Sequence, residues 1–272
     1  MNAEQSNKRA HIITISNEKG GTGKSTISMH LAVKLMMEGF SVATFDLDGR
    51  QGSLSKYIEN RKKYCEAKGI ELPIPEHTRV FPEDNYYLIP QAREKLAFQI
   101  YDASSKFDAI IIDTPGTKNY LFEEAHKFSD TVITPISDSL IDLNVLADID
   151  LESGRVRMPG HYANFIWDMK KYLASQGKSY LNWIVTGNKL SSYNSKNKAT
   201  VFSYLERLAK LYGFRFTPGL KDRVIYKELF LEGLTVLDMQ NEHLKMKMTI
   251  SHLAAKREIK SLAEFICPPE AR

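Results

Sequence analysis

Apolar residues along this chain fall into short, nearly continuous runs that alternate with longer stretches in which they recur at helical spacing. The runs occupy residues 11–16, 41–46, 107–113, 130–136 and 181–188. Such runs are typical of strands buried on both faces of a parallel sheet. The stretches between them predict a helix from Lys24 to Gly39 and further helices over 53–68, 91–105, 160–175, 197–212 and 249–266. This alternation predicts an α/β fold, with a mainly parallel twisted sheet covered by helices on both faces.

The length of the chain favours one domain. A chain of 272 residues, 43% of them hydrophobic, can bury a full core, and α/β folds of this length commonly form a single domain. We expect a polar N-terminal tail over 1–10, the domain over 11–268 and a short tail over 269–272. No apolar run approaches the roughly 18 residues that span a bilayer, and the start of the chain is polar, so a soluble cytoplasmic protein is expected. Only Cys65 and Cys267 are available, without a C-x-x-C pair, which argues against a disulfide framework or a cysteine-rich metal site.

Positive charge is concentrated in one part of the chain. The net charge is +4, but the segment from Lys189 to Lys227 has nine basic and two acidic residues and so carries +7. A basic segment on an otherwise slightly acidic protein is a possible footprint for a polyanion such as DNA, or else a set of solvated helix faces. The candidate DNA contacts are Lys196, Lys198, Arg207, Lys210, Arg215 and Lys221.

The first apolar run leads into a glycine loop, SNEKGGTGKST, at residues 16–26. Its end fits the P-loop pattern G-x-x-x-x-G-K-[ST], but Glu18 stands in place of the first glycine. Strand, loop and helix are the setting that a P-loop requires, because the loop amides and the start of the helix then face phosphate oxygens. Lys24 can reach the β and γ phosphates, and Ser25 can give its hydroxyl to a magnesium ion. The sequence therefore predicts a P-loop NTPase.

Carboxylates follow two of the other predicted strands. Asp113 ends the run AIIID, the usual place of a Walker B carboxylate that holds the metal or its water shell. Asp46 and Asp48 lie two residues apart in FDLDGRQGS, so we expect them on opposite sides of the strand end and both near the phosphates. Asp46 is a candidate to support the metal and Asp48 to orient an attacking water. The alternative for either residue is a cap on the helix that begins near Ser53.

Lys19 narrows the type of P-loop. It lies on the shoulder of the loop, and Lys24 already serves the nucleotide that the loop binds, so the Lys19 amine can serve a nucleotide bound elsewhere. The stretch KGGTGKST resembles the deviant Walker A motif, K-G-G-x-G-K-[ST], of the ParA and MinD ATPases. In that family the early lysine crosses a dimer interface to the ATP of the partner, and the position before it tolerates residues other than glycine.

Further segments resemble the MipZ-type ATPases that position the bacterial division plane. They are spread over almost the whole chain, and the more specific ones are PGLKDRVIYKELF and HLAAKREIKSL. The resemblance implies ATP and Mg²⁺ as ligands, an ATP-bound homodimer, slow dimer-dependent ATP hydrolysis and a protein associated with the nucleoid. It implies as partners a ParB-like centromere-binding protein, the tubulin-like FtsZ, whose polymerisation it inhibits, and nonspecific DNA.

The resemblance also assigns roles to residues. It makes Lys19 the intersubunit lysine, Lys24 the P-loop lysine and Asp48 the carboxylate needed for hydrolysis. The implied nucleotide-binding residues are Gly20, Gly21, Thr22, Gly23, Lys24, Ser25 and Thr26 at the phosphates, with Asn188 and Pro218 at the adenine; the implied metal residues are Ser25, Asp46 and Asp113. The chain departs from the family at Gly187, where an arginine is expected, and the DNA-binding arginines of the family are only partly represented by lysines.

Other classes of function remain open on the sequence. A MinD-like ATPase that cycles on a membrane needs a terminal amphipathic helix, and residues 255–266 do carry an apolar stripe, although such a stripe is more often core packing. A metabolic P-loop enzyme would turn over ATP only with a small-molecule acceptor. A nitrogenase-type iron–sulfur reductase needs cluster cysteines at strand ends, which Cys65 and Cys267 do not supply. A plasmid or chromosome partition ATPase differs mainly in its partner.

Overall fold

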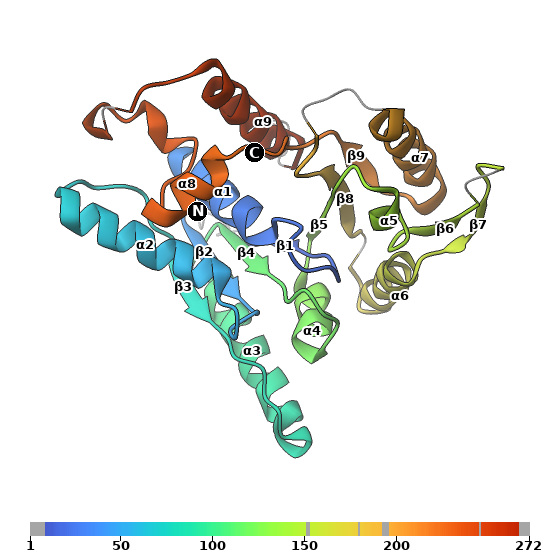
Figure 1. Ribbon diagram of the computed structural model, residues 1–272. Coiled ribbons are helices and arrows are strands. Elements are labelled where there is room, and N and C mark those ends of the chain that lie inside the picture. The colour runs from blue at the N-terminus through green and yellow to red at the C-terminus, as the bar shows by residue number, and fades with distance from the viewer. Residues whose placement is uncertain (1–8, 151–152, 179, 192–195, 245, 267–272) are drawn as a thin grey trace, which may run out of the picture.

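Seven parallel strands form the central sheet of the computed structural model, which describes residues 9–150, 153–178, 180–191, 196–244 and 246–266 (Figure 1). Their spatial order is β3 (Glu76–Arg79), β2 (Val42–Asp46), β4 (Ala109–Asp113), β1 (His11–Ile15), β5 (Thr131–Ile136), β8 (Asn182–Gly187) and β9 (Arg215–Thr217). Every pair of neighbours in this sheet runs parallel. The five predicted strands therefore form the middle of the sheet, as expected for apolar runs buried on both faces.

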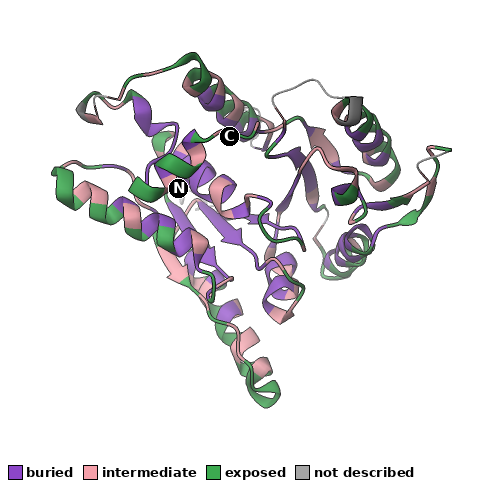
Figure 2. Cartoon of the chain, in the orientation of Figure 1, coloured by how far each residue is buried: buried purple, intermediate pink, exposed green. Residues whose placement is uncertain are grey.

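Helices cover both faces of the sheet. One face packs against α1 (Lys24–Met37), α2 (Ser53–Lys68), α8 (Ile225–Glu232) and α9 (Ile250–Ile266). The other packs against α3 (Ile89–Ser104), α4 (Tyr120–Phe128), α6 (His161–Ser175) and α7 (Lys196–Tyr212). Alternation along β1 explains the two layers, because Ile13 and Ile15 face the first group of helices and Ile12 faces the second. Figure 2 shows the resulting buried residues along the strands and the inner sides of the helices.

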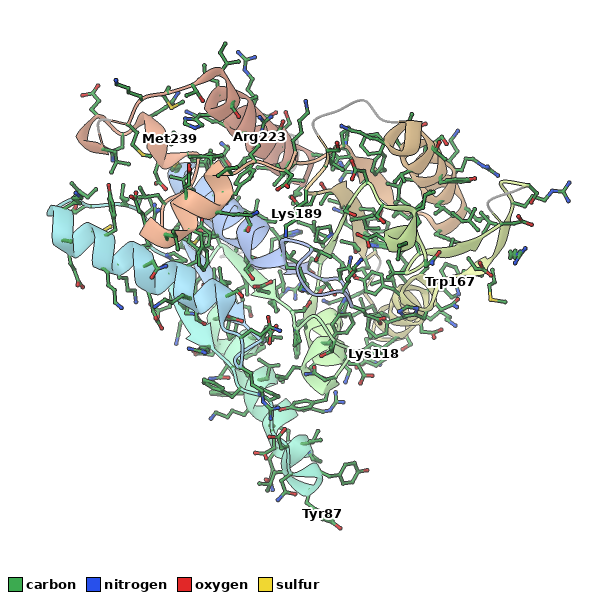
Figure 3. The ribbon with its side chains drawn as sticks, viewed as in Figure 1. Tyr87, Lys118, Trp167, Lys189, Arg223 and Met239 are labelled. Carbon is green, nitrogen blue, oxygen red and sulfur yellow. The ribbon has the colours of Figure 1, made fainter. Side chains whose placement is uncertain are left out.

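The remaining elements are short. They are the 3₁₀ turns η1 (Tyr86–Leu88), η2 (Asp238–Gln240) and η3 (Glu242–Leu244), the helix α5 (Leu140–Leu143), and the antiparallel hairpin of β6 (Ala147–Ile149) and β7 (Val156–Pro159). Together η1 and the start of α3 form an arm that projects from the body, with Tyr87 near its tip (Figures 1 and 3). In the described part of the chain no helix is both long and apolar enough to cross a membrane.

Several of these elements were not predicted from the apolar pattern. Strand β3 is EHTR and β9 is RFT, so neither has a run of buried apolar residues. Both are edge strands, which have one neighbour and are only partly covered, and a polar sequence is tolerated there. The predicted helices agree with the observed ones to within a few residues at each end, the usual uncertainty of helix boundaries.

The apolar stripe of α9 is part of the core. Ala255, Ile259, Leu262, Ala263 and Ile266 are each at most 5% exposed and belong to the cluster that α9 shares with α1. These side chains are therefore not available as a membrane-binding face in this fold, and the packing interpretation of the stripe is confirmed. The carboxyl ends of β1, β2, β4 and β8 meet at one edge of the sheet, where open α/β folds bind ligands.

Candidate nucleotide-binding site

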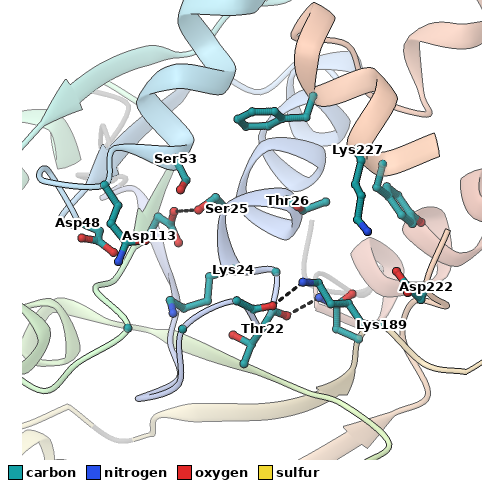
Figure 4. A pocket seen from close by; sticks show the side chains of 18 of the residues that line it. Thr22, Lys24, Ser25, Thr26, Asp48, Ser53, Asp113, Lys189, Asp222 and Lys227 are labelled. Atoms are coloured by element: carbon teal, nitrogen blue, oxygen red, sulfur yellow. Dashed lines mark hydrogen bonds between the residues drawn. The ribbon is translucent and has the colours of Figure 1, made fainter. Parts of the chain in front are cut away.

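A cavity of about 490 Å³ lies at that edge of the sheet (Figure 4). Four parts of the chain line it. The first is residues 20–26 after β1, the second is Asp48, Gln51 and Ser53 after β2, and the third is Asp113, Thr114 and Gly116 at the end of β4. The fourth is a wall made of Asn188, Lys189 and residues between 221 and 231. A cavity of this size matches a small-molecule site, and loops from several parallel strands contribute to it. The structure therefore brings most of the predicted nucleotide-binding residues to one place.

The glycine loop has the backbone of a phosphate-binding loop. Gly21 and Gly23 take positive φ angles of 72° and 87°, which glycine adopts without steric cost, and α1 begins at Lys24 directly after them. The Lys24 amine donates to the carbonyls of Asn17, at 3.3 Å, and Lys19, at 3.2 Å, so it lies over the inside of its own loop. Burial lowers the pKa of Lys24, whereas the carboxylates of Asp113 and Asp48 act against this shift. A phosphate in the loop would supply a negative charge beside this amine and so favour its protonated form.

Ser25 and Asp113 form a pair suited to magnesium. The Ser25 hydroxyl donates to Asp113 Oδ2 at 2.5 Å (Figure 4). The other oxygen, Asp113 Oδ1, is buried without a hydrogen-bond partner. Burial, followed by the charge of Asp46, raises the pKa of Asp113 to about 8, which is the expected effect of a buried carboxylate that lacks a compensating cation. Mg²⁺ commonly binds one or two protein oxygens and completes its shell with water and substrate phosphates, so these residues fit the ion.

The two carboxylates after β2 have different surroundings. Asp48 lines the cavity, and its carboxylate accepts hydrogen bonds from the backbone of Gln51 and Gly116. Burial and the charge of Asp46 raise the pKa of Asp48. Asp46 is fully buried and does not line the cavity. Its Oδ2 accepts from the backbone N–H and the hydroxyl of Ser55, at 2.9 and 2.8 Å, so Asp46 caps the first turn of α2.

Lys19 is directed away from the phosphates that its own loop can bind. Its amine forms an ion pair with Asp142 of α5, and Lys19 is not part of the cavity lining. The Lys19 side chain is 50% exposed, so it remains accessible from outside the subunit. Glu18, which replaces the usual glycine, pairs with His161 at the start of α6. The Glu18 carboxylate is therefore directed away from the phosphates that the loop can bind. This explains why position 18 does not require glycine.

The wall that contains Asn188 and Lys189 is hydrogen-bonded to the glycine loop. Asn188 Nδ2 donates to the Thr22 carbonyl and Lys189 Nζ to the Gly21 carbonyl, both at 2.5 Å (Figure 4). Lys189 has φ 53°, the only non-glycine residue with positive φ in the described chain. Pro218 does not line the cavity. It packs behind Gly187, where a Cβ would lie 2.0 Å from the Pro218 carbonyl oxygen, so the arginine expected at that position has no room.

The basic residues do not form one set. Lys221 lines the nucleotide cavity, and Arg215 donates to the Phe265 carbonyl at 2.7 Å. Lys196, Lys198, Arg207 and Lys210 lie along α7, although the side chain of Lys196 is outside the described part. Lys198 donates to the Ser191 carbonyl and Arg207 to the Gly154 carbonyl, both at 3.1 Å. Only the residues of α7 belong to one element.

Some site residues were given no role from the sequence. Asp142, Gly116 and the α8 residues Tyr226 and Phe230 reach the site only through the fold. Lys189 directly follows Asn188 at the end of a predicted strand, a position that the sequence could have suggested.

Comparisons with known proteins agree with this geometry. The sequence model of the family described as ATPase MipZ matches residues 11–267. The septum site-determining protein MinD of Helicobacter pylori is 29% identical over 189 residues, which cover 62% of this chain and 70% of that protein.

Solved structures show the same fold at low sequence identity. An ATP complex of Cyanothece McdA matches with a TM-score of 0.60 at 17% identity and covers 89% of this chain and 99% of its own. MinD of Pyrococcus horikoshii, complexed with Mg-ADP, matches with a TM-score of 0.59 at 18% identity and covers 95% and 96%. At these identities the likeness concerns the fold alone.

Proposed function

Since this chain belongs to the ATPase MipZ family, we propose that it is an ATP-dependent dimerising switch that positions the cell division site. The observation that carries the proposal is the divergence of two lysines from one loop. Lys24 lies over the inside of the loop, whereas Lys19 leaves it and pairs with Asp142. A loop that served only its own nucleotide would not need the second lysine. A dimer in which each Lys19 reaches the partner's triphosphate accounts for the presence of both lysines and for their different directions.

Each residue at the site has a defined task in this scheme. The loop amides and Lys24 hold the phosphates, and Mg²⁺ held by Ser25 and Asp113 would neutralise charge on them. Asp48 orients the attacking water, because its carboxylate is fixed by two backbone amides and faces the cavity. Asp46 acts on the metal side only indirectly: besides burial, its charge raises the pKa of Asp113. Hydrolysis to ADP and phosphate then removes the group that Lys19 contacts, and the subunits separate.

Solution mass with ATP and with ADP tests this proposal. Lys19→Ala is expected to bind ATP but to remain monomeric, because Lys24 and the loop amides still hold the phosphates. Lys24→Ala is expected to lose ATP binding itself. Asp48→Ala should bind ATP and accumulate as dimer. If Lys19→Ala formed the ATP dimer normally in light scattering, the intersubunit role of Lys19 would be wrong.

The proposed protein partners follow from family membership. They are a ParB-like centromere-binding protein and FtsZ, and the ATP dimer is expected to inhibit FtsZ polymerisation. A pelleting assay with purified FtsZ, in the presence of ATP or ADP, tests the second interaction. If this protein inhibited FtsZ equally with ATP and with ADP, the inhibition would not depend on ATP-driven dimerisation.

Nonspecific DNA is the third proposed partner, and it would hold the cytoplasmic protein at the nucleoid. Helix α7 carries Lys198, Arg207 and Lys210, and a dimer presents this helix twice. Phosphate contacts act through counterion release, so binding should fall steeply with salt and depend little on sequence. Arg207→Glu with Lys210→Glu is expected to weaken DNA binding without changing dimerisation. Equal DNA affinity of the ADP and ATP forms in fluorescence anisotropy would count against it.

A further inference from the structure

The loop that carries Asp48 is held from outside the cavity by the edge strand β3. This loop joins β2 to α2 over residues 47–52. The Gly49 N–H donates to the Val80 carbonyl at 3.1 Å, and Arg79 donates to the Gly49 carbonyl from Nε at 3.0 Å and Nη2 at 2.7 Å. Both backbone polar groups of the residue after Asp48 are therefore bound by the end of β3.

The contact between the loop and β3 leaves no free space. A Cβ on Gly49 would lie 2.2 Å from the Val80 carbonyl oxygen. Gly52 has φ 61°, and a Cβ there would lie 2.5 Å from Arg79 Nη2. Glycine at these two positions lets the loop backbone rest directly on Arg79 and Val80, so a shift of the guanidinium is passed to the loop.

A second chain of hydrogen bonds joins β3 to the start of the same loop. Asp46 Oδ1 accepts from the Asp48 N–H at 3.1 Å, and Asp46 Oδ2 accepts from Ser55, whose hydroxyl also contacts His77 Nε2 at 2.9 Å. Because the single hydroxyl proton of Ser55 goes to Asp46, His77 must donate to Ser55 from Nε2. Strand β3 thus fixes the loop on both sides of Asp48, through His77 and through Arg79.

We infer that Arg79 is a positioning residue for ATP hydrolysis, which holds Asp48 in place by fixing the carbonyl of Gly49. The inference rests on the proposed role of Asp48 in orienting water. Arg79 does not line the nucleotide cavity. Its guanidinium instead stacks on the ring of Phe81, 4.9 Å from the ring centre, on the outer side of the loop. Arg79 therefore acts on the geometry of the loop and makes no contact with the nucleotide.

Substitution of Arg79 should separate hydrolysis from binding. Arg79→Met keeps the side-chain stem on Phe81 but removes every donor to Gly49. A displacement of about 1 Å at a reacting group costs on the order of 100-fold in rate, so turnover should fall about 10- to 100-fold. ATP affinity, measured with a fluorescent ATP analogue, and ATP-dependent dimerisation should stay within about 2-fold, since the phosphate ligands are untouched. Arg79→Lys keeps one donor and should recover much of the turnover.

Arg93→Met is the matched control. Arg93 of α3 donates to Glu124 at 2.7 Å and lies 5.5 Å from the centre of the Tyr120 ring, but it makes no contact with residues 47–52. Its loss should lower stability without changing turnover. Hydrogen exchange gives a readout that is independent of activity: the peptide covering 47–54 should exchange faster in Arg79→Met and not in Arg93→Met.

A double-mutant cycle with Asp48→Ala separates this inference from the proposed function. Arg79→Met should have no further effect on turnover in the Asp48→Ala background, because the carboxylate that it positions is gone. If Asp48→Ala hydrolysed ATP at the wild-type rate, the proposed role of Asp48 would fail, whatever Arg79 does. The inference about Arg79 would be overturned if Asp48→Ala were inactive while Arg79→Met turned over ATP at the wild-type rate. It would also be overturned if Arg79→Lys turned over ATP normally although hydrogen exchange showed its 47–54 peptide to be loosened.

Discussion

The ion pair between Lys19 and Asp142 should act as a brake on dimerisation. In the isolated subunit the Lys19 amine is bound to Asp142, and in the proposed dimer it must leave to reach the partner's triphosphate. Burial would raise the pKa of Asp142, but hydrogen bonds from Lys19 and Ser137 outweigh it and the pKa is lowered. Asp142→Asn removes the charge and keeps an acceptor for Ser137, so it should release Lys19 selectively.

The size of the effect follows from the exposure of the pair. The Asp142 side chain is 6% exposed but that of Lys19 is 50% exposed, so solvent screens the interaction. A value of about 1 kcal/mol, the upper end for exposed ion pairs, is reasonable. Two subunits each lose one pair on dimerisation, which gives about 2 kcal/mol and roughly 30-fold tighter ATP dimers for Asp142→Asn. The gain should shrink as salt is raised.

Sedimentation analysis in the presence of ATP and magnesium measures this change. The Asp48→Ala background keeps ATP intact during the measurement, and ADP provides the state in which no γ-phosphate attracts Lys19. Asp102→Asn, which breaks the exposed pair with Lys106, is the control and should leave the dimer unchanged. An Asp142→Asn protein that dimerised no more tightly than its parent would refute the reasoning, as would tighter dimers with ADP.

Three further predictions concern stability and the nucleotide wall. Burial lowers the pKa of His30 and His126 to about 4, so between about pH 6.5 and 4 the unfolded chain binds protons that the native state does not. The free energy of unfolding should therefore be full above about pH 6.5 and fall toward pH 4. When it is measured by urea unfolding at a series of pH values, His126→Phe should reduce its dependence on pH by up to about 1.4 kcal/mol per pH unit. Arg61→Met should lower the free energy of unfolding by about 3–5 kcal/mol at pH 7, because it leaves the fully buried Asp238 carboxylate without its cation; a loss below 1 kcal/mol in the same assay would contradict this. Gly187→Arg, which restores the residue expected from the family, should weaken ATP binding about 10-fold or more in analogue titrations, since the wall that carries Asn188 must shift; unchanged affinity would show that the wall adapts.

The sequence by itself determined the nucleotide loop and the centre of the sheet. The strand, the glycine loop and the first helix lie within about 30 residues, and the positive φ angles that the loop needs are supplied by its own glycines. The five central strands each carry a nearly continuous apolar run, because a strand covered on both faces favours apolar side chains. The Walker B position of Asp113 follows from such a run, and the structure places it against Ser25.

The tertiary structure alone decided how the polar residues divide their roles. The sequence left either Asp46 or Asp48 as a possible cap of the helix, and in the structure Asp46 contacts the start of α2 whereas Asp48 lines the cavity. The partner of Lys19 lies 123 positions away, and Arg79 belongs to an edge strand too short and polar to be recognised. Such contacts depend on the order of the strands and on where each loop packs. Both are set by burial across the whole sheet, and no short segment encodes them.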